Sequence, residues 1–241
     1  MICQSNQGVK KRSQHRWLVD CYLKEVESDL FAELMEAENF IKAIALLKRK
    51  MRGEDDESHA ELLADIAYLS CLSGDVNQAD DFYRRAIAAF ETKGFDGSVG
   101  FGLLLQEYGI LLKEMQQYRD ALDYFFKTEG IFSNHWVRDS DVICFVELQF
   151  EIADTYVSLK EFDLALSFYE NAKKILEESF ETQSILYVFI LNNLGEVFLE
   201  LKRNIEALPL FEDALNIAEH ALLDSDCLIT IKNNLLKAKG G

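Results

Sequence analysis

The same 24-residue pattern occurs four times between residues 63 and 214. The copies begin at Leu63, Leu105, Gln149 and Leu191, and the first reads LADIAYLSCLSGDVNQADDFYRRA. A repeat of a few tens of residues is typical of a solenoid, in which stacked units bury a continuous core and expose a long surface. Such a surface is suited to binding another protein or peptide. The repeat therefore predicts a binding protein rather than an enzyme.

Each copy has the pattern of two helices separated by a short break. In the first half, apolar residues recur at steps of three and four, as in Leu194, Phe198 and Leu201, which predicts a helix with one buried stripe. In the second half, an alanine is followed four residues later by an aromatic residue. Small and large side chains on facing stripes interlock in a close antiparallel pair. The matched positions are Ala67, Gly109, Ala153 and Gly195 in the first helix, then Ala79, Ala121, Ala165 and Ala207, and the aromatic Tyr83, Phe125, Tyr169 and Phe211 in the second.

This arrangement resembles the tetratricopeptide repeat (TPR) family, in the small residues of the first helix and the alanine–aromatic series of the second. The matched alanines lie 42, 44 and 42 residues apart, a longer period than the common TPR of about 34 residues. Long-period repeats of this kind are similar to those of kinesin light chains and bacterial peptide-pheromone regulators. The resemblance implies an all-α fold, a right-handed α-α superhelix (TPR solenoid) of about five helical hairpins plus a C-terminal capping helix.

The flanking sequences suggest how the chain is organised. We expect a flexible basic tail over residues 1–16 and a single TPR domain over residues 17–241. The stretch around Ala43 carries the repeat pattern weakly, with Phe40 before the alanine and Leu47 after it. The expected units are a degenerate repeat at 17–52, clear repeats at about 58–93, 99–133, 140–180 and 184–222, and a capping helix at 226–238.

Charge and composition narrow the choice of partner. The formal net charge is −17, and residues 1–16 carry four basic residues and no acid, so the remainder carries −21. A body this acidic repels phosphate backbones, and we expect no nucleic acid partner; an RNA-binding helical repeat is the least favoured alternative. There is no apolar run long enough to span a membrane and no secretory signal. With five scattered cysteines, this predicts a reduced, cytoplasmic protein without membrane contact.

No pattern of catalytic residues is found in the sequence. The phosphate-binding motif GxxxxGK[ST], the dinucleotide motif GxGxxG and the zinc motif HExxH are all absent. The four histidines stand far apart, whereas a metal site needs three or four convergent donors. We therefore expect a non-enzymatic protein with no catalytic residues, no cofactor and no metal site.

The TPR resemblance implies that the first helix of each unit lines a concave groove. Carboxylates or an amide occur there at equivalent positions of the four repeats. A second set of equivalent positions lies one helical turn further along. An acidic groove with some apolar side chains suits a basic or amphipathic peptide or helix. The alternative is that a chain with 42 acids in 241 residues places carboxylates on every exposed face. The expected groove residues are Asp65, Tyr68, Glu107, Phe150, Glu151, Asp154, Asn192, Asn193 and Glu196.

The adjacent amides Asn192 and Asn193 have a more specific implication. In long-period TPRs similar to this chain, asparagines on the concave helix hydrogen-bond the main chain of a bound peptide, since an amide both donates and accepts. The favoured function is thus an adaptor or scaffold that binds a peptide or helix of another protein. The alternative is a regulatory sensor whose superhelix changes shape on binding a short signalling peptide. The sequence leaves self-association open.

Overall fold

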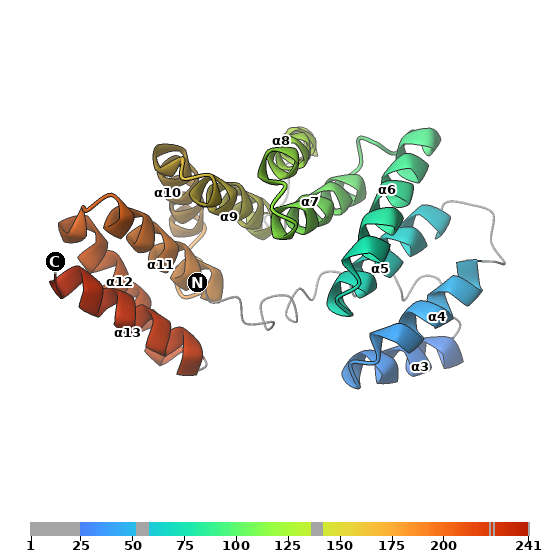
Figure 1. The fold of residues 1–241 in the computed structure, drawn as a ribbon, viewed down its shortest axis with the longest axis horizontal. Helices are drawn as coiled ribbons and strands as arrows, with labels where there is room; N and C mark the ends of the chain where they lie inside the picture. Colours follow the sequence, from blue (N-terminus) through green and yellow to red (C-terminus); the bar gives the residue numbers. More distant parts are fainter. Residues whose placement is uncertain (1–24, 52–57, 136–141, 222, 224, 241) are drawn as a thin grey trace. The chain divides into compact units, whose positions relative to one another are not determined.

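The computed structural model describes residues 25–51, 58–135, 142–221, 223 and 225–240 (Figure 1). The basic tail expected at residues 1–16 and the start of the degenerate repeat lie outside the described residues. The chain divides into two compact units, here called the N-terminal unit (within residues 4–135) and the C-terminal unit (within residues 136–241).

The described residues of both units form helices and no strands. No described helix is both long enough and apolar enough to cross a lipid bilayer. The N-terminal unit contains α3 (Glu25–Glu36), α4 (Phe40–Met51), α5 (Ser58–Leu72), α6 (Val76–Lys93), α7 (Val99–Glu114) and α8 (Tyr118–His135). The C-terminal unit contains α9 (Val142–Ser158), α10 (Phe162–Glu178), α11 (Ile185–Glu200), α12 (Asn204–His220) and α13 (Ser225–Gly240).

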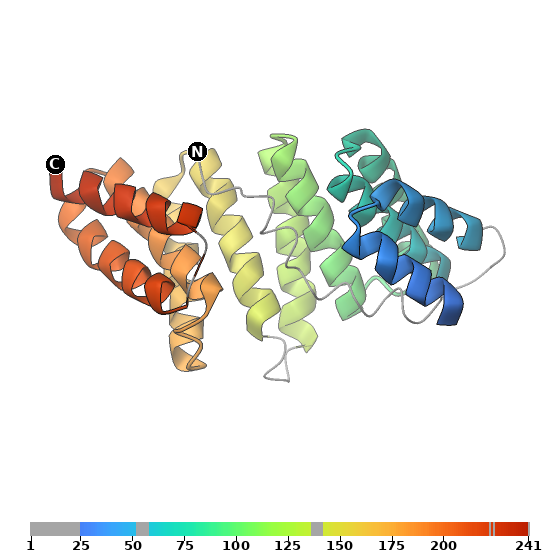
Figure 2. The same cartoon turned by 90° about the horizontal axis from the view of Figure 1, so that it is seen from below.

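Consecutive helices pair as hairpins. Helices α5 and α6, α7 and α8, α9 and α10, and α11 and α12 run side by side in both views of the molecule (Figures 1 and 2), and α13 packs on α12. The fold is therefore an all-α helical repeat, as the sequence predicts. The hydrophobic core of the C-terminal unit is formed by residues from several helices, among them Leu176 of α10, Leu191 of α11, Ala214 of α12 and Ile231 of α13.

The close approach of paired helices depends on the matched small residues. A Cβ atom added to Gly109 of α7 would lie 2.6 Å from a ring carbon of Phe125 in α8. In the C-terminal unit, a Cβ on Gly195 of α11 would lie 2.7 Å from the ring of Phe211 in α12. Both rings are fully buried. The ring of the second helix thus fills the space left by the missing side chain of the first.

The turn inside each hairpin has the same backbone geometry. The residue two places after the last helical residue of α5 is Gly74, with φ of 80°, and Gln116, Lys160 and Lys202 occupy the equivalent place with φ of 62°, 60° and 61°. Its amide and the next one donate back to carbonyl groups of the last helical turn, as from Lys202 to Leu199 (3.0 Å). This is a left-handed C-terminal cap that favours glycine. Glu38, in the turn between α3 and α4, has a φ of 52°, so four of the five described hairpins use a residue with a long side chain.

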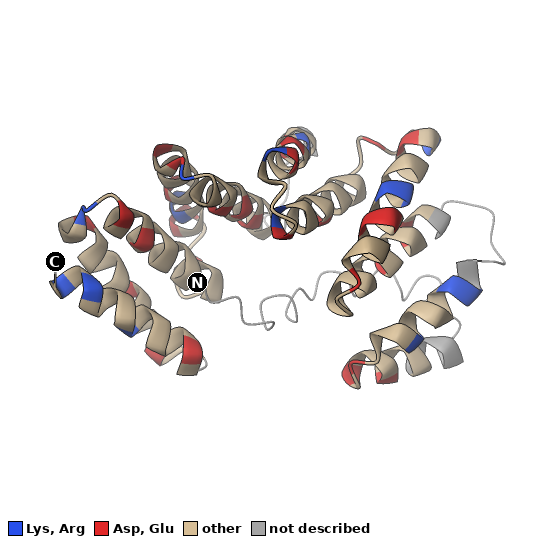
Figure 3. Cartoon of the chain, in the orientation of Figure 1, with Lys and Arg blue, Asp and Glu red and all other residues tan. Residues whose placement is uncertain are grey.

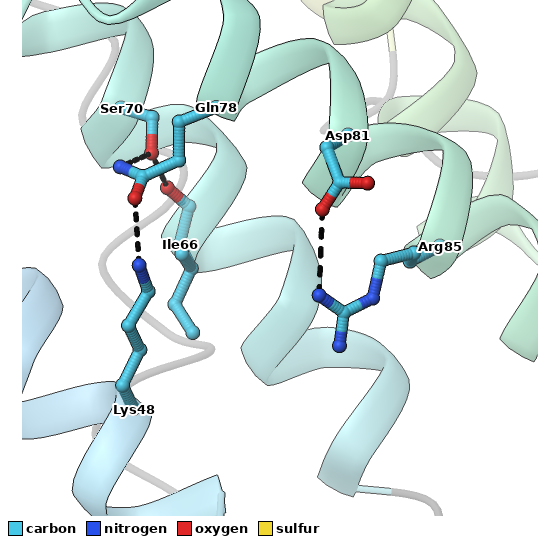
Figure 4. Close-up of polar contacts among 6 residues, drawn as sticks. All are labelled: Lys48, Ile66, Ser70, Gln78, Asp81 and Arg85. Carbon is cyan, nitrogen blue, oxygen red and sulfur yellow. Dashed lines mark hydrogen bonds and ion pairs between the residues drawn. The ribbon is translucent and has the colours of Figure 1, made fainter.

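Polar contacts join neighbouring hairpins in the N-terminal unit. Lys48 of α4 donates to the side chain of Gln78 in α6 (2.6 Å), and Gln78 donates to Ser70 of α5 (2.8 Å). Figure 4 shows these side chains aligned, with the Ser70 hydroxyl donating to the carbonyl of Ile66 (2.6 Å). The Lys48 ammonium also lies 4.8 Å from the ring centroid of Phe82. The degenerate first hairpin is thereby attached to the first clear repeat.

Candidate peptide-binding site

The nine residues that the sequence places in a groove lie on the first helices of four hairpins. Three of these residues are in the N-terminal unit and six are in the C-terminal unit. Asp65 and Tyr68 lie on α5 and Glu107 on α7. The other six lie on α9 and α11 and are Phe150, Glu151, Asp154, Asn192, Asn193 and Glu196. A single groove that runs through all nine residues stays a prediction.

In the C-terminal unit, hydrogen bonds connect the predicted amides into one network. The Asn192 side chain donates to Glu196 (3.0 Å) and to Asn193 (3.3 Å). Asn193 in turn donates to the Tyr169 hydroxyl of α10 (3.2 Å). Asn234 of α13 donates to the side-chain oxygens of Asn192 (3.0 Å) and Glu196 (2.6 Å). The network therefore connects α11 to α10 and to α13.

Burial gives these amides a structural role. Asn192 and Asn193 are each 7% exposed and Asn234 is 4% exposed, and a buried amide without partners would be costly. The Tyr169 ring is fully buried and packs edge-on against Phe150, with 5.6 Å between ring centroids. Burial also raises the pKa of Tyr169 well above its ordinary value. The amides thus connect the helices of the unit through hydrogen bonds. Their role in binding a peptide main chain stays a prediction.

A pocket of about 1250 Å³ opens beside this network, and we call it the C-terminal pocket. All residues that line it lie between Asp154 and Ala238, within the C-terminal unit. Of the predicted groove residues, Asp154, Asn193 and Glu196 line it. The structure thus brings three of the nine expected residues together in one pocket. Asn192 donates hydrogen bonds to two of them, Asn193 and Glu196.

The pocket has acidic, basic and apolar parts. Glu200 joins Asp154 and Glu196 among its acids, and its cations are Lys160, Lys202 and Lys237. In Figure 3, acidic positions can be followed along α11 and basic positions toward the C-terminal end of α13. Apolar contact comes from Phe162, Leu208 and Ile205, and the last of these is 87% exposed. The pocket therefore carries equal numbers of positive and negative side chains.

The N-terminal unit presents a different environment at the equivalent positions. Asp65 is 3% exposed, and its Oδ2 atom has no hydrogen-bond partner among the described residues. Burial raises the pKa of Asp65 well above its ordinary value, and the charge of Glu61 raises it further. Burial also raises the pKa of Glu61. Glu107 and Tyr68 are half-buried. Asp65 is thus a covered carboxyl group rather than a solvent-facing acid.

The described residues hold no group of three or more histidine, cysteine, aspartate or glutamate side chains that could bind a metal ion. A thiol nucleophile is disfavoured at Cys71, because burial raises the pKa of this thiol to about 12. The lining of the C-terminal pocket combines charged and apolar side chains from the helices of this unit and from the turns between them.

The three lysines of the pocket are not among the groove residues predicted from the sequence. A signal for two of them was present, because Lys160 and Lys202 stand where the first clear repeat has Gly74. A lysine in place of a glycine at a left-handed cap is unusual. Lys237 had no such signal, because a lysine near the end of an amphipathic helix is common.

Comparison with known proteins agrees with this geometry. Residues 146–220 match the family model described as tetratricopeptide repeat. No curated protein sequence matches the chain. Among solved structures, it is similar to a putative kinesin light chain of Podosopora anserina with nearly identical TPR-like repeats, at a TM-score of 0.66 and 15% identity, covering 88% of this chain and 97% of that one.

Two further solved structures have the same fold. BtubC (BKLC) from P. vanneervenii gives a TM-score of 0.62 at 16% identity, covering 98% of this chain and 85% of that one. The apo form of RapI gives 0.66 at 13% identity, covering 89% of this chain and 70% of that one. The fold thus defines a helical-repeat protein of the solenoid class. The match to the tetratricopeptide repeat family covers residues 146–220, within the C-terminal unit, and the other described hairpins have the same helical-repeat fold. Repeats of this family are protein-interaction modules.

Proposed function

We propose that this chain is a non-enzymatic adaptor or scaffold that binds a peptide or helix of another protein in the C-terminal pocket. The observation that carries the proposal is the pocket itself. It is large enough for several peptide residues, and the amide network holds its walls on packed helices. A preorganised site of this kind loses little conformational entropy on binding.

The expected ligand is basic or amphipathic. Asp154, Glu196 and Glu200 supply negative charge, and Ile205 and Phe162 supply apolar contact. Side chains that line a groove with alternating charge and apolar surface recognise extended or helical segments. The acidic body favours a protein partner over nucleic acid. We place this activity in the cytoplasm because the scattered cysteines suit a reducing compartment.

Peptide selection followed by two matched variants tests the proposal. Peptides are selected from a displayed random library on the intact chain, and their Kd values are measured by fluorescence anisotropy. Glu200→Lys changes an exposed acid of the pocket, and Asp123→Lys makes the same charge change at an exposed position of α8. We expect Glu200→Lys to weaken basic peptides about fivefold or more, from the loss and reversal of a surface ion pair, and Asp123→Lys to weaken them less than twofold.

Two results contradict the proposal. If the library yields no peptide that binds the folded chain, peptide binding is wrong. If peptides are selected but Asp123→Lys and Glu200→Lys affect them equally, the C-terminal pocket is not the binding site. Circular dichroism of both variants keeps unfolding from being mistaken for loss of binding.

The peptide sensor is the second candidate. The fold similarity to RapI, and the resemblance to peptide regulators noted in the sequence, favour it. A sensor binds its peptide more tightly in one shape than in another, so that the peptide shifts the population. Small-angle scattering with and without a selected peptide separates the two roles. A change in radius of gyration on saturation supports the sensor, and an unchanged radius supports the adaptor.

A further inference from the structure

The hairpin turns next to the C-terminal pocket place lysines where the backbone favours glycine. Lys160, between α9 and α10, has φ of 60°, and Lys202, between α11 and α12, has φ of 61°. A residue with a side chain costs about 1 kcal/mol in this left-handed conformation. The equivalent Gly74 of the N-terminal unit avoids this cost, whereas Gln116 of the same unit does not. Residues in disfavoured backbone conformations cluster at functional sites, where the side chain has a use.

Both lysines line the pocket, and both are exposed. The described residues form no ion pair with either of them, whereas other cations of this unit do pair, such as Lys232 with Glu219 and Lys239 with Glu212. Lys237, the third cation of the pocket, donates to the Asn234 side chain (3.2 Å) and is held by the amide network. The two turn lysines thus offer positive charge to a ligand rather than to the fold.

The acids of the pocket belong to the helices rather than to the turns. Asp154 lies on α9, four residues before the end of that helix, and Glu196 and Glu200 lie on the last turns of α11. Asp154 is 7% exposed, and Glu196 accepts hydrogen bonds from Asn192 and Asn234. Negative charge is therefore built into the helical wall, and positive charge stands at the turns. A ligand with only one sign of charge is attracted to one of these groups and repelled by the other.

We infer that the C-terminal pocket recognises a dipolar peptide segment, in which basic side chains contact Asp154, Glu196 and Glu200 and acidic side chains contact Lys160 and Lys202. This inference rests on the proposed function and specifies its ligand. It differs from what the net charge of −17 alone suggests, which is that a purely basic peptide binds best. Exposed Ile205 provides apolar contact for residues between the two charged groups.

Four synthetic peptides of 12 residues test the inference. All share the same leucine and alanine residues and have blocked termini. One carries three lysines followed by three glutamates, and a second carries the same charges in reverse order. In the third, glutamine replaces every glutamate, so that the peptide is only basic. In the fourth, glutamine replaces every lysine, so that the peptide is only acidic. Binding is measured at physiological salt, where long-range attraction by the acidic body is screened.

We expect one of the two dipolar peptides to bind about fivefold more tightly than the basic peptide, which corresponds to two exposed ion pairs. The acidic peptide is expected to bind most weakly. The double variant Lys160→Gly with Lys202→Gly is expected to abolish the preference for the dipolar peptide. The same variant is expected to leave the basic peptide bound equally well or slightly better, because it removes two positive charges.

This variant is well matched to the question, because glycine is favoured at both positions and the fold is expected to be unaffected or stabilised. Gln116→Gly is the control, since Gln116 has the same backbone conformation with φ of 62° in the N-terminal unit. It is expected to leave all four affinities unchanged. If the basic peptide binds as tightly as the dipolar ones, or if the double variant keeps the preference, the inference is wrong while peptide binding stands. If no peptide binds, the proposed function itself fails.

Discussion

The N-terminal and C-terminal units carry different side chains at the same repeat position. Asp65 of α5 is buried with an Oδ2 atom that has no hydrogen-bond partner among the described residues, whereas Asn193 of α11 donates to Tyr169 and accepts from Asn192. The neutral amide joins a network beside a pocket, and the carboxyl group carries a desolvation cost. The repeat framework thus tolerates both, and the polar positions of the first helices are where the units have become different.

The framework itself is shared, and its disruption has the largest expected effect. Gly109→Ala and Gly195→Ala each place a Cβ atom within 2.7 Å of a buried ring carbon in their unit. Overpacking of this kind costs up to about 3 kcal/mol, and the better helix propensity of alanine returns about 1 kcal/mol of it. We expect a net loss of about 2 kcal/mol in the unit that carries the change, measured by amide hydrogen exchange.

Gly130→Ala in α8 is the internal control for this prediction. A Cβ atom added at Gly130 meets nothing within 4 Å, so only the propensity gain remains and the unit is expected to be stabilised by about 0.5–1 kcal/mol. Equal effects of Gly130→Ala and Gly109→Ala would contradict the view that matched small residues hold the hairpins together.

The shared framework was readable from the sequence because it depends on spacing. The steps between Ala79, Ala121 and Ala165 predicted the hairpins, and the contact of Gly109 with Phe125 followed from matched small and large positions. Helix periodicity shows which face of a helix is apolar, but it does not show which polar residues beside that face become covered. For that reason the burial of Asp65 was not predicted.

The lysines of the pocket were missed for a different reason. Lys160 and Lys202 lie in turns, and their importance depends on a left-handed backbone and on a pocket formed by helices that are distant in sequence. Spacing along one repeat carries no information on either property. The acidic groove expected from the sequence stays a prediction, whereas the pocket in the C-terminal unit is lined by three acids and three lysines.

Exchanging the two polar residues is expected to have an intermediate effect. Asp65→Asn removes a buried ionisable group, and we expect it to stabilise the N-terminal unit by about 1–2 kcal/mol at neutral pH. Asn193→Asp removes the amide that donates to Tyr169 and is expected to destabilise the C-terminal unit by a similar amount. Thermal unfolding and hydrogen exchange measure both changes.

The pH dependence of stability tests the role of the Asp65 carboxyl group. Because the folded pKa of Asp65 is raised above its unfolded value, the folded state binds the extra proton. The contribution of Asp65 to stability is therefore lost as pH rises from the ordinary carboxyl range through the raised pKa. Wild-type protein should lose stability of the N-terminal unit over that window, and Asp65→Asn should lose less. If Asp65→Asn destabilises the unit at neutral pH, the carboxyl group is needed for a contact rather than merely tolerated.

Substitutions at the helix caps are expected to have the smallest effect on stability. They test whether the two units share the same framework while differing in their polar side chains. Ser98 is the N-cap of α7 and accepts a hydrogen bond from the amide of Phe101 (3.1 Å), and Ser184 is the N-cap of α11 and accepts one from the amide of Tyr187 (3.2 Å). Their backbone conformations are nearly the same. Ser98→Ala and Ser184→Ala are each expected to cost about 1 kcal/mol, read from hydrogen exchange in the first turn of the helix. The control is Ser167→Ala at an exposed position inside α10, with no loss expected. Clearly unequal costs at the two caps would mean that the units differ in their framework as well as in their polar side chains.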